Sequence, residues 1–347
     1  MKQLKFFMFI LLAITIFSCY SNKLGLYYVD IIWEPTDNLP NLDPDLGNWY
    51  ITVATDGNIW TYYGNKLYLS TDNGDTWIKK NNIPFSLISS LIVVNPVNGY
   101  IFASCNNGYT DELGLYRSTD NGENWEHILD NVSTTIGVLC TTSGEIYVGA
   151  AKKLFEERES VCYYSNDNGN TWIEKSKGLP AWFSPDAVGK DGTLYARTKR
   201  GVYRSTDDGN TWLPPSNYDT PIFSLAICDS AIFVTTNIRV SDRFILKSTD
   251  KGRNWNTVNT GFDDPPVPYR IISNLVTNDI FVINYIRSSI SQQDYNELYR
   301  SSNLGKYWKS ESSGFPNQVG WLAVNPKTGQ MFAGTPNGVY RTKNYPK

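Results

Sequence analysis

One short motif recurs along this chain, and its spacing restricts the fold more than any other feature. The first copy begins at Ser70-Thr71-Asp72-Asn73-Gly74 and ends at Trp77. Its leading Ser or Thr recurs at positions 70, 118, 165, 205, 248, 301 and 342, at a mean spacing of about 45 residues. Repeats of this length are single supersecondary units that stack on their neighbours. The chain is therefore predicted to be a repeat protein along most of its length.

The copies of the motif share a Ser, an Asp two residues later, a Gly and a Trp; we call each copy a box. The boxes are Ser70, Asp72, Gly74, Trp77; Ser118, Asp120, Gly122, Trp125; Ser165, Asp167, Gly169, Trp172; Ser205, Asp207, Gly209, Trp212; Ser248, Asp250, Gly252, Trp255; and the degenerate Ser301, Asn303, Gly305, Trp308. A seventh half-copy, 339–342, closes the chain.

The residue types of the box favour a tight hairpin turn. Ser and Asp oxygens accept hydrogen bonds from backbone N–H groups in such turns. Gly tolerates the left-handed conformation that the turn requires. The Trp folds back over the hairpin and buries a large ring, about 150–250 Å². The box is therefore predicted to be a structural staple.

Each repeat divides into four strands, and the box follows the third. In the last repeat, an apolar strand over 319–324 and a second strand over 330–334 are separated by the turn 325–329. We predict an all-β fold, a single seven-bladed β-propeller of four-stranded antiparallel blades over 19–347. The last blade lacks a fourth strand, and the apolar segment 26–35 is expected to supply it and close the ring. The predicted blades cover 49–82, 85–131, 133–180, 181–217, 221–263, 267–316, and 319–347 with 26–35.

The box resembles the Asp-box, or BNR repeat. This repeat occurs in propellers of bacterial sialidases, sortilin-type receptors, xyloglucanases and photosystem assembly factors. The resemblance covers nearly all of the chain after residue 18. It implies the propeller fold, but it does not imply one activity, because in this superfamily the box turns lie away from the usual ligand face.

The first eighteen residues are predicted to be an export signal. Lys2 and Lys5 precede an apolar run over 6–17, which ends in Ser18-Cys19. This ending resembles a bacterial lipobox, in which 1–18 is removed and Cys19 becomes the lipidated first residue. The alternative is an ordinary signal peptide with Cys19 as a free thiol. We expect a lipid-anchored protein of the cell envelope, on the outer membrane or cell surface.

Composition excludes several kinds of function. A formal net charge of −3 disfavours a nucleic-acid partner. The single histidine, His127, disfavours a multi-histidine metal site or a histidine-based triad. The other four cysteines, Cys105, Cys140, Cys162 and Cys228, have irregular spacing and are interpreted as small buried residues. The boxes lack the ligand pattern of a calcium loop. We expect a monomer with no metal and no cofactor.

The connections between blades carry the candidate binding residues. Long loops between second and third strands are predicted to share one face with the inter-blade connections. Aromatic residues on that face could stack on sugars or hold a peptide, with packing between blades as the alternative. The candidates are the aromatic residues Trp182, Phe223, Tyr269 and Trp321 and the arginines Arg158, Arg239, Arg243 and Arg287.

The residues do not form a recognisable catalytic set. The sialidase pattern needs an Arg-Ile-Pro motif before the first box, whereas the first arginine here is Arg117, and Tyr269-Arg270-Ile271 lies before the sixth box. A xyloglucanase-like enzyme needs two carboxylates facing a cleft, and usually two propellers. We therefore assign no catalytic residue and expect a non-catalytic module that binds protein or glycan. The alternative is a sialidase-like or xyloglucanase-like glycoside hydrolase.

Overall fold

The fold is known from a computed structural model, which describes most of the chain after residue 30. The described residues are 31–36, 39, 50–63, 66–80, 92–105, 113–152, 159–215, 219–237, 243–262, 266–286 and 295–345. The predicted signal 1–18, Cys19, and the loop arginines Arg158, Arg239 and Arg287 lie outside these ranges. The side chain of Arg243 is also outside the description.

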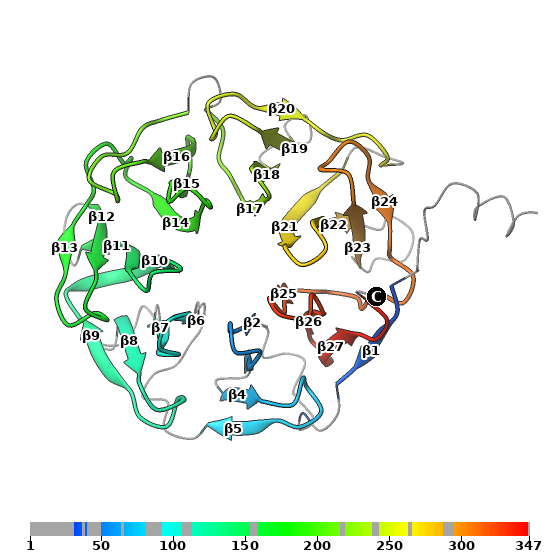
Figure 1. The fold of residues 1–347 in the computed structure, drawn as a ribbon, viewed down its shortest axis with the longest axis horizontal. Coiled ribbons are helices and arrows are strands. Elements are labelled where there is room, and N and C mark those ends of the chain that lie inside the picture. The colour runs from blue at the N-terminus through cyan, green and yellow to red at the C-terminus, as the bar shows by residue number, and fades with distance from the viewer. Residues whose placement is uncertain are drawn as a thin grey trace, which may run out of the picture.

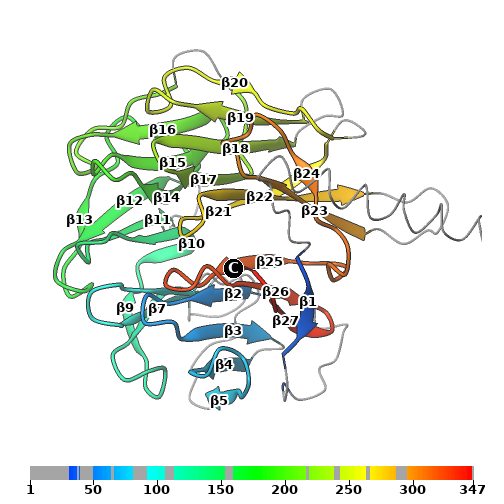
Figure 2. The same cartoon turned by 45° about the vertical axis from the view of Figure 1, so that its right-hand side comes forward.

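Seven antiparallel sheets form a ring around a common axis, which confirms the predicted seven-bladed propeller (Figure 1). In six blades the strands follow chain order from the axis to the rim, and in the last blade the N-terminal strand takes the place at the rim (Figure 1 and Figure 2). Blades 1 to 3 consist of β2 (Tyr50–Val53), β3 (Ile59–Tyr63), β4 (Lys66–Ser70), β5 (Ile78–Lys80); β6 (Ile92–Val94), β7 (Ile101–Cys105), β8 (Gly114–Ser118), β9 (Glu126–Leu129); and β10 (Val132–Cys140), β11 (Ile146–Lys152), β12 (Ser160–Ser165), β13 (Ile173–Glu174).

Blades 4 to 7 repeat this order with two variations. Their strands are β14 (Phe183–Val188), β15 (Leu194–Thr198), β16 (Gly201–Ser205); β17 (Ser224–Cys228), β18 (Ala231–Asn237), β19 (Arg243–Ser248), β20 (Asn256–Thr257); β21 (Pro268–Asn274), β22 (Asp279–Ile286), β23 (Tyr295–Ser301), β24 (Lys309–Ser310); and β25 (Trp321–Val324), β26 (Met331–Thr335), β27 (Gly338–Thr342), β1 (Trp33–Pro35). In blade 4 the fourth strand is reduced to one bridge, in which Leu213 and Arg204 exchange backbone hydrogen bonds of 2.8 and 3.1 Å.

The ring closes as predicted, through the N-terminal strand. β1 pairs antiparallel with β27, with Trp33 opposite Thr342 and Pro35 opposite Tyr340. Trp33 is buried and packs edge-on against Phe315 of the preceding blade at 5.4 Å. Joining the two ends of the chain in one sheet removes an exposed strand edge.

The boxes form turns with one repeated set of hydrogen bonds. In all six, the Ser hydroxyl donates to the Asp or Asn Oδ1 at 2.7–3.0 Å, and the Gly N–H donates to the Ser Oγ at 2.8–2.9 Å. The backbone N–H four residues after the Asp or Asn donates to the same Oδ1. The residue before each Gly also has a positive φ, between 55° and 63°.

Each second strand carries an aliphatic residue followed by a buried aromatic ring. The pairs are Ile59-Trp60, Ile101-Phe102, Ile146-Tyr147, Leu194-Tyr195, Ile232-Phe233, Ile280-Phe281 and Met331-Phe332. Several of these rings support the box turn of the next blade. A Cβ placed on Gly305 would lie 2.9 Å from Phe233, and one on Gly122 would lie 3.3 Å from Trp60. The box Gly thus allows the turn to approach the neighbouring blade.

Cations on the third strands stabilise the same junctions. Arg117 of blade 2 donates to the Asn168 carbonyl in the box of blade 3 at 2.7 Å. Lys247 of blade 5 donates to the Leu304 carbonyl in blade 6 at 2.8 Å, and Arg341 of blade 7 donates to the Asn73 carbonyl in blade 1 at 2.9 Å. Because these carbonyls belong to the box turns, each box connects two blades as well as two strands.

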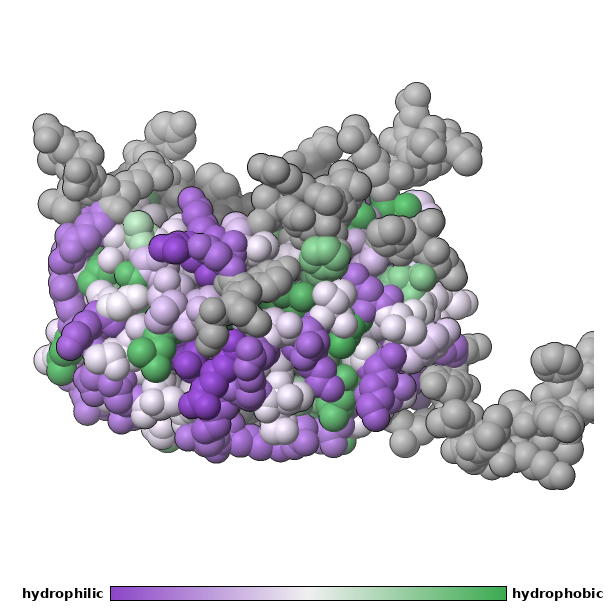
Figure 3. Space-filling model, turned by 90° about the horizontal axis from the view of Figure 1, so that it is seen from above, coloured by the Kyte–Doolittle hydropathy of each residue, from purple (hydrophilic) through white to green (hydrophobic). Residues whose placement is uncertain are grey.

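The cysteines and the outer surface fit this packing. Cys105, Cys162 and Cys228 are buried and Cys140 is half-buried, and none of the four forms a disulfide within the described part of the chain. The side of the disc in Figure 3 is mostly hydrophilic, with small separate hydrophobic spots. In the described part of the chain, no helix is long and apolar enough to cross a membrane.

We predict that removing β1 destabilises the ring. A chain that starts at residue 37 loses the pairing with β27 and the Trp33–Phe315 contact, and its melting temperature should fall by about 5 °C or more, given losses of several kcal/mol for a buried Trp. A chain that starts at residue 31 is the matched control. Equal melting temperatures for the two chains would contradict the closure.

We also predict an acid-sensitive contribution from the boxes. Hydrogen bonds from the residue four positions later lower the pKa of Asp72, Asp120, Asp167, Asp207 and Asp250 to about 2, from a usual value near 3.8. Because these pKa values are depressed by folding, the stabilisation is present above pH 4 and is lost as the pH falls toward 2.

A variant with all five aspartates changed to Asn tests this pH dependence. Asn303 shows that an amide oxygen can accept the same bonds. The variant should fold, and its melting temperature should fall less than that of the wild type between pH 4 and pH 2. Parallel pH curves for the two proteins would show that the box carboxylates do not titrate with unfolding.

Candidate functional site

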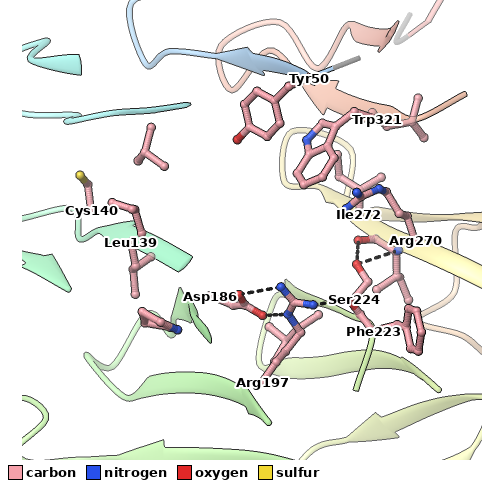
Figure 4. Close-up of a pocket in the computed structure, with 16 residues that line it drawn as sticks. Tyr50, Leu139, Cys140, Asp186, Arg197, Phe223, Ser224, Arg270, Ile272 and Trp321 are labelled. Atoms are coloured by element: carbon pink, nitrogen blue, oxygen red, sulfur yellow. Dashed lines mark hydrogen bonds and ion pairs between the residues drawn. The ribbon is translucent and has the colours of Figure 1, made fainter. Parts of the chain in front are cut away.

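A central cavity of about 330 Å³ opens where the innermost strands of the seven blades meet (Figure 4). Every blade contributes at least one lining residue, so no single repeat contains the site. The polar and aromatic lining residues are Tyr50, Asp186, Arg197, Phe223, Ser224, Arg270 and Trp321. The remainder is mainly aliphatic, with Cys140 on the wall of blade 3. Burial raises the pKa of the Cys140 thiol to about 12, so it is protonated at neutral pH.

Trp321 is held between two other side chains of the cavity. The ring centroids of Tyr50 and Trp321 are 4.6 Å apart, and Cζ of Arg270 lies 3.3 Å from the Trp321 ring centroid. In Figure 4 the Trp321 ring lies between Tyr50 and Arg270. Tyr50 donates a hydrogen bond to the Ile92 carbonyl at 3.0 Å. Trp321 therefore joins blades 6, 7 and 1, which is the packing alternative considered for this residue.

Asp186 reaches the cavity through a β-bulge. The register of β14 against β15 shifts between Pro185 and Ala187, which leaves Asp186 without a cross-strand partner. Bulges of this kind redirect a side chain and are frequent beside active sites. Asp186 pairs with Arg197, whose Nη2 lies 3.1 Å from Oδ1, and it accepts a hydrogen bond from Ser184 at 2.7 Å. A Cβ on Gly137 would lie 2.1 Å from the Ser184 hydroxyl, so this position needs glycine.

The cavity holds two guanidinium groups and one carboxylate among its lining residues. Arg197 is bound by Asp186 and also donates to the Phe223 carbonyl. Arg270 donates through Nε to the Gly320 carbonyl at 2.9 Å, and no carboxylate within the described ranges forms an ion pair with it. Burial and, secondarily, the charge of Arg270 lower the pKa of Arg197 to about 10. Burial also lowers the pKa of Arg270. Both groups remain cationic at neutral pH.

A second cavity, of about 430 Å³, lies at the junction of blades 6 and 7; we call it the side cavity. Its lining includes three tyrosines, Tyr269, Tyr285 and Tyr295, together with Asn296 and Gly320. A register shift between Pro268 and Arg270 places Tyr269 at a bulge. Tyr269 and Gly320 precede Arg270 and Trp321 of the central cavity, so the two cavities adjoin.

The structure brings three of the four candidate aromatic residues to these cavities. Phe223 and Trp321 line the central cavity and Tyr269 lines the side cavity, whereas Trp182 is half-buried and lines neither. Phe223 is 43% exposed, and Tyr285 and Tyr295 are 36% and 38% exposed. These three rings are therefore exposed enough for a ligand to cover part of their surface.

Several residues of the site were missed by the sequence reasoning. Tyr50, Asp186 and Arg197 were not candidates, and Arg270 was noticed only as part of a misplaced motif. Asp186 and Tyr269 stand at bulges, where the alternation of inward and outward residues is broken. The aliphatic–aromatic pair marks the second strand of every repeat, which lies next to the innermost strand. Arg197 follows Leu194 of that pair by three residues, so an alignment of the repeats on this pair would have placed Arg197 near the axis.

His127 is explained by packing. Its Nε2 lies 3.0 Å from the Leu113 carbonyl, and its ring stacks on Tyr116 at 4.3 Å. It lies on β9, the outermost strand of blade 2, away from both cavities.

Comparisons with known proteins point to carbohydrate-active enzymes. The chain is 28% identical over 196 residues to a xyloglucanase of Paenibacillus sp. The matched segment covers 46% of this chain and 18% of the relative. It is 26% identical over 276 residues to the xyloglucanase Xgh74A of Acetivibrio thermocellus. This match covers 62% of this chain and 31% of the relative. The chain thus spans less than a third of either relative. No protein-family model matches it.

Solved structures agree on the fold. An ancestral GH74 enzyme superposes with a TM-score of 0.64 at 15% identity, over 89% of this chain and 46% of that one. A chain of the mitotic checkpoint complex superposes with a TM-score of 0.59 at 9% identity, over 90% of each. Likeness at this level of identity shows the propeller fold alone.

The expectation of a non-catalytic binding scaffold is corrected by these matches. Both named relatives are xyloglucanases, so the alternative, a glycoside hydrolase, fits better. The expectation failed because it was based on finding no catalytic motif within any one stretch of the sequence. The site that the structure shows draws residues from different blades, about 45 residues apart in sequence.

Proposed function

We propose that this protein is a glycoside hydrolase propeller of the xyloglucanase kind, which binds a polysaccharide across the side cavity and the mouth of the central cavity. The observation that carries the proposal is the match to two xyloglucanases in a ring whose two adjoining cavities expose aromatic rings. Sugar rings present C–H faces that pack on such rings, while polar groups fix their orientation.

Asp186 is the carboxylate that the cavities provide for catalysis. It is the acidic side chain among the residues that line them, and its pairing with Arg197 favours the ionised form. Glycosidases use a pair of carboxyl groups, of which the nucleophile or base is ionised and the acid is protonated. Asp186 therefore suits the nucleophile or base, and Ser184 and Arg197 would hold its oxygens in place.

Hydrolysis of xyloglucan tests this assignment. Release of reducing ends by the purified protein is expected, and Asp186→Asn should lower kcat by at least about 100-fold, since loss of a general base or nucleophile has at least that effect. Glu145→Gln is the matched control, because Glu145 lies in the β10–β11 turn, where it is bonded to Thr141 and Ser143. Wild-type protein without activity on xyloglucan would contradict the proposal.

We propose further that the chain belongs to the Asp-box superfamily, and that Cys19 is lipidated and anchors the protein at the cell envelope. The six boxes with one hydrogen-bond pattern support the first proposal. The sequence around Cys19 supports the second.

Metabolic labelling tests the lipid anchor. In bacteria that express the full chain, labelled palmitate should enter the protein and the protein should sediment with membranes. Cys19→Ser should abolish the label and release the protein from the membrane fraction, whereas Cys140→Ser should change neither. Label retained after Cys19→Ser would reject the anchor.

A further inference from the structure

We infer that the protein docks on an anionic lipid bilayer through one sector of the face that carries the boxes, which we call the box face. The contact surface, the basal patch, belongs to blades 6 and 7 and consists of Ile32, Leu275, Val276, Lys327 and Lys343. The inference goes beyond hydrolysis and rests on the proposed lipid anchor at Cys19. Three observations support it: the place where the chain enters the ring, the exposed aliphatic side chains there, and the distribution of charge.

The chain enters the ring at the box face. β1 runs antiparallel to β27 with Trp33 opposite Thr342, so β1 begins beside the end of β27 (Figure 1). In the other blades the box follows this same end of the third strand. Residues 20–30 separate Cys19 from Ile31, and a chain of that length spans at most about 40 Å. A bilayer that holds a lipid on Cys19 is therefore within this distance of the box face of blade 7.

Ile32 and Lys343 lie at the entry point itself. The Lys343 N–H donates to the Ile32 carbonyl at 2.8 Å, and the Ile32 N–H donates to Asn344 Oδ1 at 2.8 Å. Lys343 Nζ lies 3.4 Å from a Glu34 oxygen, but the lysine side chain is 65% exposed. Glu34 also pairs with Arg341 at 3.0 Å, so one carboxylate serves two cations. Lys343 thus keeps its charge at the surface.

The turn between β21 and β22 is joined to both of its neighbours on this face. The hydroxyl oxygens of Thr277 and Tyr345 are 2.7 Å apart, which places the turn beside the last residues of blade 7. Asn274 Nδ2 donates to the Gly329 carbonyl at 2.6 Å, which joins the same turn to the turn between β25 and β26, where Lys327 lies. The basal patch is therefore one continuous surface around the start of β1.

The aliphatic side chains of the basal patch are exposed. Ile32 is 51% exposed, Leu275 is 61% exposed and Val276 is 45% exposed. One exposed aliphatic residue is ordinary, whereas several beside lysines on one surface mark a place of contact. Binding to a bilayer surface increases with the apolar area that enters the headgroup region and with attraction to anionic lipids. The basal patch offers both.

Charge divides the box face into two sectors. In the described turns 275–278, 302–308, 325–330 and 343–345 of blades 6 and 7, the charged side chains are lysines and none is acidic; they are Lys306, Lys327 and Lys343. In the corresponding turns of blades 1 to 3 every charged side chain is acidic; these are Asp56, Asp72, Asp75, Asp120, Glu123, Glu145 and Asp167. An anionic surface attracts the first sector and repels the second. The disc therefore meets the bilayer through blades 6 and 7.

This orientation leaves the side cavity open to the outside. Tyr285 and Tyr295, which line it, lie at the end of β22 and the start of β23. That end of blade 6 is opposite to the β21–β22 turn and the box of the same blade. A polysaccharide would therefore approach from the side away from the membrane.

Hydrogen exchange of the lipidated protein on vesicles tests the inference. On vesicles of equimolar phosphatidylcholine and phosphatidylglycerol, amide exchange in 275–278 should be slower than in the Cys19→Ser protein in solution. On phosphatidylcholine alone the slowing should be lost. The blade 2 turn is the internal reference, because Val97 is 63% exposed and its N–H is bonded to Asn95 as the Val276 N–H is bonded to Asn274. No slowing at 275–278, or equal slowing at 95–98, would overturn the inference.

Matched substitutions assign the contact to the basal patch. Each lysine near an anionic surface strengthens binding about fivefold, so Lys327→Gln with Lys343→Gln should lower the ratio of docked to undocked protein about 30-fold. Lys190→Gln is the control, because Lys190 is 73% exposed on the same face, in blade 4. Val276→Asn should also reduce the slowing, whereas Val97→Asn should not. Unchanged slowing after the double lysine substitution would overturn the inference.

The outcome is separable from those of the lipid anchor and the hydrolase. If palmitate labelling shows no lipid on Cys19, coupling of the Cys19 thiol to a maleimide lipid in the vesicles supplies the same tether, and the exchange measurement decides. Slowing at 275–278 without hydrolysis of xyloglucan would support the docking and reject only the hydrolase. Hydrolysis without slowing would do the reverse.

Discussion

The structure depends on the contact between the box turn of one blade and the buried ring of the blade before it. The turn needs two consecutive left-handed residues, of which the second is Gly, and the absent Cβ lets the turn meet a ring such as Phe233 or Tyr147. Cations from the third strands then donate hydrogen bonds to the carbonyls of the same turns. Because each box holds its own hairpin and the adjacent blade, the ring is stabilised junction by junction, as expected of a repeat protein.

This rigid ring explains how irregular backbone can occur at its centre. The first strands of blades 4 and 6 have bulges at Asp186 and Tyr269, and both bulges face regular second strands. The second and third strands behind them pair without register shifts. The regular second and third strands therefore support the bulged first strands, and the bulges bring Asp186 and Arg270 into one cavity whose lining has an excess of positive charge.

The fold could be predicted from the sequence because its signals are periodic. The spacing of Ser70, Ser118 and their equivalents gave the number of blades, and the missing fourth strand of the last blade pointed to the segment before residue 35. The site could not be predicted in the same way. Bulges interrupt the alternation that strand patterns rely on, so Asp186 gave no signal, and the sandwiching of Trp321 by Tyr50 and Arg270 joins residues more than 200 positions apart. The expectation of a non-catalytic scaffold was wrong for a related reason. It was based on local motifs, and a site whose residues come from seven repeats has no local motif.

A crystal structure of the Asp186→Asn protein with a xyloglucan oligosaccharide tests the central claim most directly. The account predicts ordered sugar rings against Phe223, Tyr269, Tyr285 or Tyr295, with one glycosidic oxygen near the side chain at position 186. An oligosaccharide bound at the box turns, or no sugar at the two cavities under saturating ligand, would contradict it.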